Sequence, residues 1–161
     1  MENLYRVRLI NLYNLMKNLM LFVVIGSFLA TGCKKYSDGG LVSKADKRLS
    51  ANSWKLQKYL RNGNDETSQL LISNFTETFA ENGTITRSYT DSNGDPFSES
   101  GNWTFDNDKM QINLTGVGSI ELTNQTSTVS ASDYNIIRLK KDELWYYYEN
   151  GGSRHEFHLI K

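Results

Sequence analysis

The chain has 161 residues, with 18 Lys and Arg, 18 Asp and Glu, and a formal net charge of +0 at pH 7. This balance argues against a nucleic-acid-binding protein, which would carry a basic excess. The length fits one domain, and a single cysteine excludes an internal disulfide, so the fold must be held together by packing.

The chain begins with a leader that contains a short apolar run. This run covers residues 19–30, follows Lys17 and ends just before the cysteine at position 33. Its twelve residues would reach about 18 Å as a helix, whereas a membrane span needs about 20 apolar residues. The run therefore has the length and the basic flank of the apolar part of a secretory signal peptide. A buried helix is the alternative.

The residues directly before the cysteine, Leu29-Ala-Thr-Gly32, are small or apolar. Together with Cys33 they resemble a bacterial lipobox, the signal at which a lipoprotein precursor is cut and acylated. The resemblance implies cleavage between Gly32 and Cys33, a diacylglycerol on the Cys33 thiol and a third acyl chain on its new amino group. More than one acyl chain anchors a protein firmly to a membrane. We therefore expect residues 1–32 to be a signal peptide and the protein to be lipid-anchored in a bacterial cell envelope.

Three details extend this expectation. Met16-Lys17-Asn18 is typical of the start of a signal peptide, so Met16 is a candidate true start. An aspartate directly after the lipidated cysteine favours retention at the inner membrane. Lys34 occupies this position, so the sequence resembles that of a lipoprotein sorted to the outer membrane. Cleavage after residue 32 would remove three cations and one anion and leave 15 cations and 17 anions. The mature chain would therefore still lack a basic excess.

The segment after the cysteine is polar and contains Gly39-Gly40. Such a composition predicts a flexible connection, so residues 33–42 are expected to form a lipidated tether. Ser43 to Asn52 could form a short helix with Ser43 as its N-cap. The folded domain is expected to cover residues 43–161.

From Trp54 onward, short runs of alternating apolar and polar residues are separated by turn signals. Asn82-Gly83 between two such runs is a strong hairpin signal. The predicted strands cover residues 54–61, 75–79, 84–90, 101–105, 110–114, 120–122, 134–139, 144–148 and 155–160. The connections are too short for crossover helices, so neighbouring strands should be antiparallel.

Eight or nine strands in one open sheet would leave exposed edges. Closure into an all-β, antiparallel up-and-down β-barrel removes these edges, and this is the predicted fold class. A β-sandwich is the alternative. An eight-stranded barrel is just wide enough for side chains to fill it or for one small ligand to enter it.

Four short motifs occur in order along the predicted strands. They are Trp54-Lys-Leu56, Phe79-Ala-Glu-Asn-Gly-Thr84, Gly101-Asn-Trp-Thr-Phe105 and Asp142-Glu-Leu144. Their order and spacing behind a lipobox resemble the lipocalin-like domains of small bacterial lipoproteins, over roughly Leu49 to Lys161. Asn52 departs from the family pattern, which often has Gly two residues before the first Trp. The resemblance implies a small barrel with an interior cavity and no defined ligand.

Candidate metal and catalytic groups are few. His155 and His158 are three residues apart on a predicted strand and point to opposite faces. The run Asp91-x-Asn93-x-Asp95 lacks the Gly and the Glu that a calcium loop requires at its sixth and twelfth positions, so it predicts a plain turn. No hydroxyl stands in a motif with a base and an orienting partner. We therefore expect a protein that is not an enzyme and has no metal and no cofactor.

Aromatic residues at alternating positions could line the barrel. If Trp103 and Phe105 point inward, the candidate ligand-binding residues are Phe79, Tyr89, Trp103, Phe105 and Tyr146. The expected function is then binding of a small apolar or amphipathic molecule, with tyrosine hydroxyls as polar contacts. The same rings could instead fill the interior.

The predicted strand over residues 144–148 is apolar on both faces. Trp145 and Tyr147 should lie on the face opposite Tyr146. If one face lines the interior, the other must be covered by the N-terminal segment or be offered to a partner. The alternative function is therefore a surface module that contacts an envelope protein or glycan through an exposed aromatic face.

Overall fold

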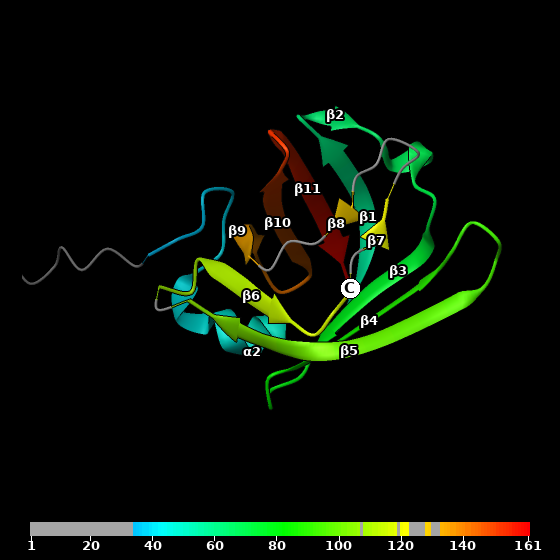
Figure 1. Cartoon of the computed structure of the whole chain (residues 1–161). Coiled ribbons are helices and arrows are strands. Elements are labelled where there is room, and N and C mark those ends of the chain that lie inside the picture. Colours follow the sequence, from blue (N-terminus) through cyan, green and yellow to red (C-terminus); the bar gives the residue numbers. More distant parts are fainter. Residues whose placement is uncertain (1–33, 107, 119, 123–127, 130–132) are drawn as a thin grey trace, which may run out of the picture. The chain divides into compact units, whose positions relative to one another are not determined.

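The computed structural model describes residues 34–106, 108–118, 120–122, 128–129 and 133–161 (Figure 1). The strands are β1 (Ser53–Arg61), β2 (Asn64–Asp65), β3 (Ser73–Phe79), β4 (Thr84–Thr90), β5 (Pro96–Phe105), β6 (Gln111–Thr115), β7 (Ile120–Glu121), β8 (Thr128–Val129), β9 (Asp133–Leu139), β10 (Glu143–Asn150) and β11 (Ser153–Ile160). The helical elements are η2 (Val42–Lys44), α2 (Ala45–Leu49) and η3 (Thr67–Gln69). The predicted signal peptide, with its cleavage site at Gly32 and Cys33, lies outside the described residues.

The described strands confirm the predicted barrel. Nine of them form one sheet in the order β11-β10-β9-β6-β5-β4-β3-β1-β2, and every pairing is antiparallel. Because β11 also pairs with β1, eight strands close into a ring and β2 is a short addition to β1. Within this ring the strands follow one another in chain order, which is the up-and-down topology. Closure leaves the ring without a free edge, which a sandwich would not achieve.

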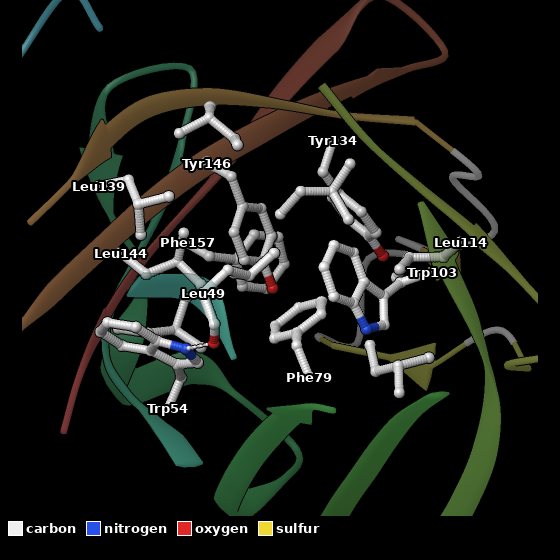
Figure 2. Packing of buried hydrophobic residues seen from close by; sticks show 14 of the residues in the cluster. Leu49, Trp54, Phe79, Trp103, Leu114, Tyr134, Leu139, Leu144, Tyr146 and Phe157 are labelled. Carbon is white, nitrogen blue, oxygen red and sulfur yellow. Dashed lines mark hydrogen bonds between the residues drawn. The ribbon is translucent and has the colours of Figure 1, made fainter. Parts of the chain in front are cut away.

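The short helix α2 covers one end of the barrel. Its Ala45 and Leu49 are fully buried. The indole N–H of Trp54, at the start of β1, donates to the backbone oxygen of Leu49 at 2.9 Å (Figure 2). The helix is shorter than the predicted segment of residues 43–52, and the predicted capping by Ser43 is wrong, since none of the described side chains caps α2. Burial of its two apolar residues holds this helix in place.

The N-terminal segment from Lys34 to Leu41 also differs from the expectation of a flexible tether. The side chain of Tyr36 is only 2% exposed, and its hydroxyl donates to the backbone oxygen of Lys109 at 2.8 Å. The backbone N–H of Asp38 donates to the oxygen of Ile137 on β9 at 2.8 Å. Lys34 is therefore part of the folded unit.

The glycine pair Gly39-Gly40 explains why this segment lies against the barrel although its composition is typical of a linker. Gly39 accepts a hydrogen bond from the N–H of Leu139 at 3.1 Å. Gly40 has a φ of +106°, and a Cβ at this position would come within 2.1 Å of the oxygen of Leu139. Only glycine allows the backbone to approach β9 so closely in this conformation.

The opposite end of the barrel is formed by the far ends of the strands. The β4–β5 hairpin is paired from Thr84 and Asn102 to Thr90 and Pro96, and it projects past the other strands on the side away from α2 (Figure 1). For reference we call this end the open end and the α2 end the closed end. The chain after β6 lies against the open end: the N–H of Leu71, just before β3, donates to the oxygen of the fully buried Leu122 at 2.8 Å. Among the described residues, no helix is long and apolar enough to cross a membrane.

Candidate functional site

Aromatic and aliphatic side chains occupy the closed end of the barrel (Figure 2). Phe79 and Trp103 meet edge to face, with ring centroids 5.8 Å apart. The indole N–H of Trp103 donates to the backbone oxygen of Ala80 at 2.9 Å. These contacts tie β3 and β5 together and make this end a packed core.

Charged side chains lie farther along the inner face. Glu77 on β3 and Arg87 on β4 are each 1% exposed, and they are direct partners in the strand register. Arg87 donates from Nε and Nη2 to Oε1 of Glu77 at 3.0 and 2.8 Å. Tyr146, from β10, donates its hydroxyl to Oε2 of Glu77 at 2.8 Å. A buried charge is tolerated when it is paired and hydrogen-bonded, as it is here.

The protein itself uses all the donors of Arg87. A guanidinium has five N–H groups. Besides the two bonds to Glu77, Nη2 donates to the hydroxyl of Tyr134 at 3.2 Å, and Nη1 donates to Oε1 of Glu99 and to the backbone oxygen of Gly118, both at 3.4 Å. Burial alone would lower the pKa of Arg87, but Glu77 raises it above its usual value. The guanidinium is therefore charged and saturated.

Glu99 brings a second carboxylate to the same guanidinium. Its Oε2 accepts a hydrogen bond from the backbone N–H of Gly118 at 2.7 Å, and its side chain is 29% exposed. Burial raises the pKa of Tyr134 to about 12 and that of Tyr146 well above 10, so both phenols stay protonated near neutral pH. With both carboxylates ionised, the group formed by Glu77, Arg87 and Glu99 carries one excess negative charge. We call these three residues the polar centre.

A neutral imidazole lies on the same inner face, nearer the open end. Nδ1 of His155 is 2.7 Å from the hydroxyl of Tyr59 in a hydrogen bond. Burial lowers the pKa of His155, and the nearby charge of Arg61 acts in the same direction. The His155 ring stacks on Tyr148, with centroids 4.7 Å apart and planes at 4°. His155 therefore adds no positive charge to the interior at neutral pH.

Among the described residues, the hydroxyl of Tyr148 is one of four buried side-chain polar atoms without a hydrogen-bond partner; the others belong to Asn52, Glu66 and Arg138. Tyr148 is 1% exposed, and its hydroxyl has no hydrogen-bond partner in the part of the chain that the structure describes. Its ring meets that of Tyr134 edge to face at 5.8 Å, and Arg87 lies within electrostatic range. Most buried polar groups are hydrogen-bonded, so this hydroxyl is an exception within the packed interior.

An aromatic pair continues the inner face at the open end. Tyr89 and Phe97 are register partners on the projecting hairpin, and their rings stack 5.5 Å apart at 7°. They share the face of Arg87 and Glu99, because residues two apart on a strand point the same way. Phe97 is 51% exposed. The hairpin therefore offers an apolar surface on the same face as Arg87 and Glu99, two residues farther along β4 and β5.

The five predicted ligand-binding residues lie at different levels of the barrel. Phe79 and Trp103 belong to the closed end, and Phe105 packs edge to face on Trp103 at 5.3 Å. Tyr146 is bound to the polar centre, and Tyr89 lies at the open end. Their part in ligand binding stays a prediction.

The predicted ligand-binding site did not include the residues of the polar centre, or Tyr134, Tyr148 and Phe97. Glu77 stands between Phe75 and Phe79, and Arg87 stands between Ile85 and Tyr89, each at an inward parity. A charged residue at a position that alternation assigns to the core was the available signal.

The outer face of β10 is in contact with side chains of the two neighbouring strands. Trp145 is paired with Arg138 on β9 and with His158 on β11. The His158 ring stacks on it at 3.9 Å, and the Arg138 guanidinium carbon lies 3.8 Å from its ring centroid. Arg154 lies over Tyr147 at 3.7 Å. Side chains of the adjacent strands therefore lie against these two half-buried rings, and the offer of this face to a partner stays a prediction.

A small hollow of about 190 Å³ lies on the outside, beside α2. Its lining residues are Asp46, Lys47, Ser50, Glu81 and Trp103. Pockets for small molecules usually measure about 300–1,000 Å³ and are mostly apolar, so this hollow is a weak candidate for a ligand site.

The chain belongs to a family of lipocalin-like domains, whose family model matches residues 51–146. Among solved structures it is similar to a lipocalin-like protein from Bacteroides uniformis, at 15% identity and a TM-score of 0.47, over 71% of this chain and 98% of that chain. It is also similar to Japanin from Rhipicephalus appendiculatus bound to cholesterol, at 7% identity and a TM-score of 0.47, over 71% of this chain and 76% of that chain. No curated protein matches the sequence significantly.

Proposed function

We propose that this protein is a lipid-anchored lipoprotein of the cell envelope whose barrel binds a small apolar or amphipathic molecule without catalysing a reaction. The observation that carries the binding proposal is the buried, unpartnered hydroxyl of Tyr148. Membership of a lipocalin-like family supports it, because such folds commonly bind small hydrophobic ligands.

Towards the open end, the barrel has both an apolar surface and a polar group that such a ligand could contact. Its apolar part would lie against the Tyr89 and Phe97 rings, which already form an accessible stacked pair. Its polar end would reach inward to Tyr148. Binding sites of this kind are mostly apolar, with a few polar groups that fix orientation.

The alternative of a surface module is less well supported by the outer face of β10. A sugar stacks on an open ring face, but Arg138 and His158 lie against Trp145 from the two neighbouring strands. A partner would have to displace both side chains before it could use this ring.

Binding is tested with the lipidated protein held in lipid nanodiscs, with empty nanodiscs as the control for partitioning. Fatty alcohols, fatty amines, fatty acids, isoprenoids and aromatic metabolites are added, and the melting of the barrel is followed by tryptophan fluorescence. A ligand at 100 times its Kd should stabilise the fold by about 2.7 kcal/mol. If no compound shifts the melting curve, the surface alternative gains.

The anchoring proposal rests on the lipobox at residues 29–33 and on Lys34 for the outer membrane. The full chain and its Cys33→Ala variant are expressed with a labelled fatty acid, and the membranes are separated. The unchanged chain should take up label and sediment with the outer membrane, whereas Cys33→Ala should take up none. Labelled Cys33→Ala would show that the proposed acylation site is wrong.

A further inference from the structure

The N-terminal segment covers a stretch of β9 that extends past the neighbouring strand of the ring. We infer that residues 34–41, which we call the strap, guard this edge of β9. When the strap is released, the edge should pair with the same edge of a second copy of this chain. The inference concerns self-association and is independent of the proposed ligand and of the proposed anchor.

The first step is that β9 continues beyond the start of β6. The ladder between these strands ends at the pair of Gln111 and Asn135. It ends there because β6 begins at Gln111, after a turn in which the Asp106 carboxylate accepts the N–H of Gln111 at 3.0 Å. On its other side, β9 stays paired with β10 as far as Leu139. Among the described strands, residues 137–139 therefore have a partner on one side only.

The second step is that the strap occupies the other side of these residues. The N–H of Asp38 donates to the oxygen of Ile137 at 2.8 Å, and the N–H of Leu139 donates to the oxygen of Gly39 at 3.1 Å. A neighbouring antiparallel strand would bond to the same kind of backbone groups. Covering a strand edge with a loop is one of the ways in which proteins prevent edge-to-edge association.

The third step is what holds the strap in place. Tyr36 is 2% exposed, and its hydroxyl donates to the oxygen of Lys109 in the turn before β6. Lys34 pairs with Asp108 in the same turn. Gly40 fits closely against β9 because it has no Cβ. Tyr36 is the buried side chain of the strap, so its truncation should release the segment.

The fourth step is the character of the edge that release would expose. The oxygen of Ile137 and the N–H of Leu139 would lose their partners, beside the buried side chain of Ile136. Arg138, the charged residue of this stretch, already pairs with Glu143 at 2.8 Å, which weakens repulsion between two copies. An uncovered edge is a template for pairing with another chain. Antiparallel pairing of one segment with its own copy about a twofold axis is self-complementary, so the second copy is the fitting partner.

Release of the strap is tested with Tyr36→Ala in the protein purified in detergent, so that the test does not depend on acylation. Ser37→Ala is the matched control, because this exposed hydroxyl in the same segment makes one long contact, at 3.5 Å, with the oxygen of Ile137. Hydrogen exchange followed by mass spectrometry should show the Leu139 amide of dilute Tyr36→Ala exchanging at least about tenfold faster than in Ser37→Ala. The Trp103 amide, which donates to Gly83 at 2.8 Å, should keep its rate. Equal rates at Leu139 would overturn the holding role of Tyr36.

Self-association is measured on the same proteins by sedimentation velocity at rising concentration. The dimer fraction of Tyr36→Ala should exceed that of Ser37→Ala at least about threefold, and its Leu139 amide should regain protection as the dimer forms. Fast exchange at Leu139 without additional dimer would overturn the inference that the strap guards this edge. Dimers that leave Leu139 unprotected would overturn it as well.

A second variant keeps the test open if Tyr36→Ala does not fold. Lys34→Glu places a like charge beside Asp108 at an exposed site, so it loosens the strap without emptying a buried position. It should move both measurements in the same direction as Tyr36→Ala, and adding Asp108→Lys should reverse them. Unchanged exchange and an unchanged dimer fraction in Lys34→Glu would then decide against the inference.

Discussion

The hydroxyls of Tyr146 and Tyr148 lie two residues apart on the inner face of β10, but only the first has a partner. Tyr146 donates to Glu77 at 2.8 Å, whereas the hydroxyl of Tyr148 is buried without a hydrogen bond to any described residue. The same substitution at these two positions should therefore have opposite effects on stability.

Tyr148→Phe removes a polar group that the fold leaves unsatisfied. Burying such a group costs about 1–3 kcal/mol, so its removal should leave the free energy of unfolding unchanged or raise it by about 1 kcal/mol. Urea unfolding of the unliganded protein measures this. A loss of 1 kcal/mol or more would mean that the hydroxyl has a stabilising partner after all.

Tyr146→Phe removes a bond to a buried carboxylate and leaves Oε2 of Glu77 without that donor. Hydrogen bonds to charged groups contribute about 1.5–3 kcal/mol, and the variant should lose a similar amount. Because both substitutions delete one hydroxyl from the same strand, Tyr148→Phe is the matched control in the same urea experiment. A smaller loss in Tyr146→Phe than in Tyr148→Phe would contradict the structure.

Arg87 should be far more important to stability than an exposed cation. Arg87→Met strands the charge of Glu77 in the interior and should cost about 3–5 kcal/mol. Adding Glu77→Gln removes that stranded charge, so the double variant should be more stable than the sum of the two single losses predicts. The control is Lys58→Met: Lys58 and Asp65 form an exposed pair at 3.3 Å, and the loss should be at most about 1 kcal/mol. Additive losses at Glu77 and Arg87 would disprove their coupling.

His155 should make stability depend on pH. Burial lowers its pKa in the folded state, so the unfolded chain, with the ordinary value near 6.5, binds more protons as the pH falls. The stabilising contribution is complete above the unfolded value and decreases below it, so stability should fall from pH 7.5 to pH 5.5. In His155→Gln, which keeps a group able to accept a hydrogen bond from Tyr59, the fall should be shallower. Parallel melting-temperature profiles for the two proteins would rule His155 out as a cause.

Trp103 should be a core residue. It is buried, donates to Ala80 and contacts Phe79 and Phe105 edge to face. Truncation of such a residue typically costs about 3–5 kcal/mol. Trp103→Ala should therefore melt far earlier or fail to fold, whereas Phe97→Ala, at an exposed ring, should stay within about 0.5 kcal/mol of the unchanged protein. Near-equal melting of the two variants would place Trp103 outside the core.

Much of the barrel was predictable because alternation and turn chemistry are local. The strand predicted over residues 84–90 is found with the same bounds as β4, after a turn in which Gly83 has a φ of +85°. β5 begins at Pro96 instead of Gly101, because its first half continues the pairing with β4 as far as Thr90 in the projecting hairpin. The docked N-terminal segment was missed because its composition is also that of a linker.

The polar centre was not predictable, because three-dimensional closure creates it. Only the β3–β4 register places Glu77 opposite Arg87, and only ring closure brings Tyr146 from β10 to the same carboxylate. Alternation could assign an inward face to each residue. It could not show that the hydroxyl of Tyr148 would have no hydrogen-bond partner among the described residues, because that depends on which donors and acceptors the folded chain brings within reach.

The docking of the N-terminal segment has a consequence for how the barrel would be presented. Lys34 pairs with Asp108 at 2.9 Å, in the turn between β5 and β6 at the closed end. Tyr36 and Asp38 add two hydrogen bonds to the rest of the fold, so this segment is held by the barrel at three points. If Cys33 carries the lipid that we propose, the anchor would be joined to the barrel through a docked segment and not through a free linker. Substitutions that release the segment, such as Tyr36→Ala, would then lengthen the tether without touching the acylation site.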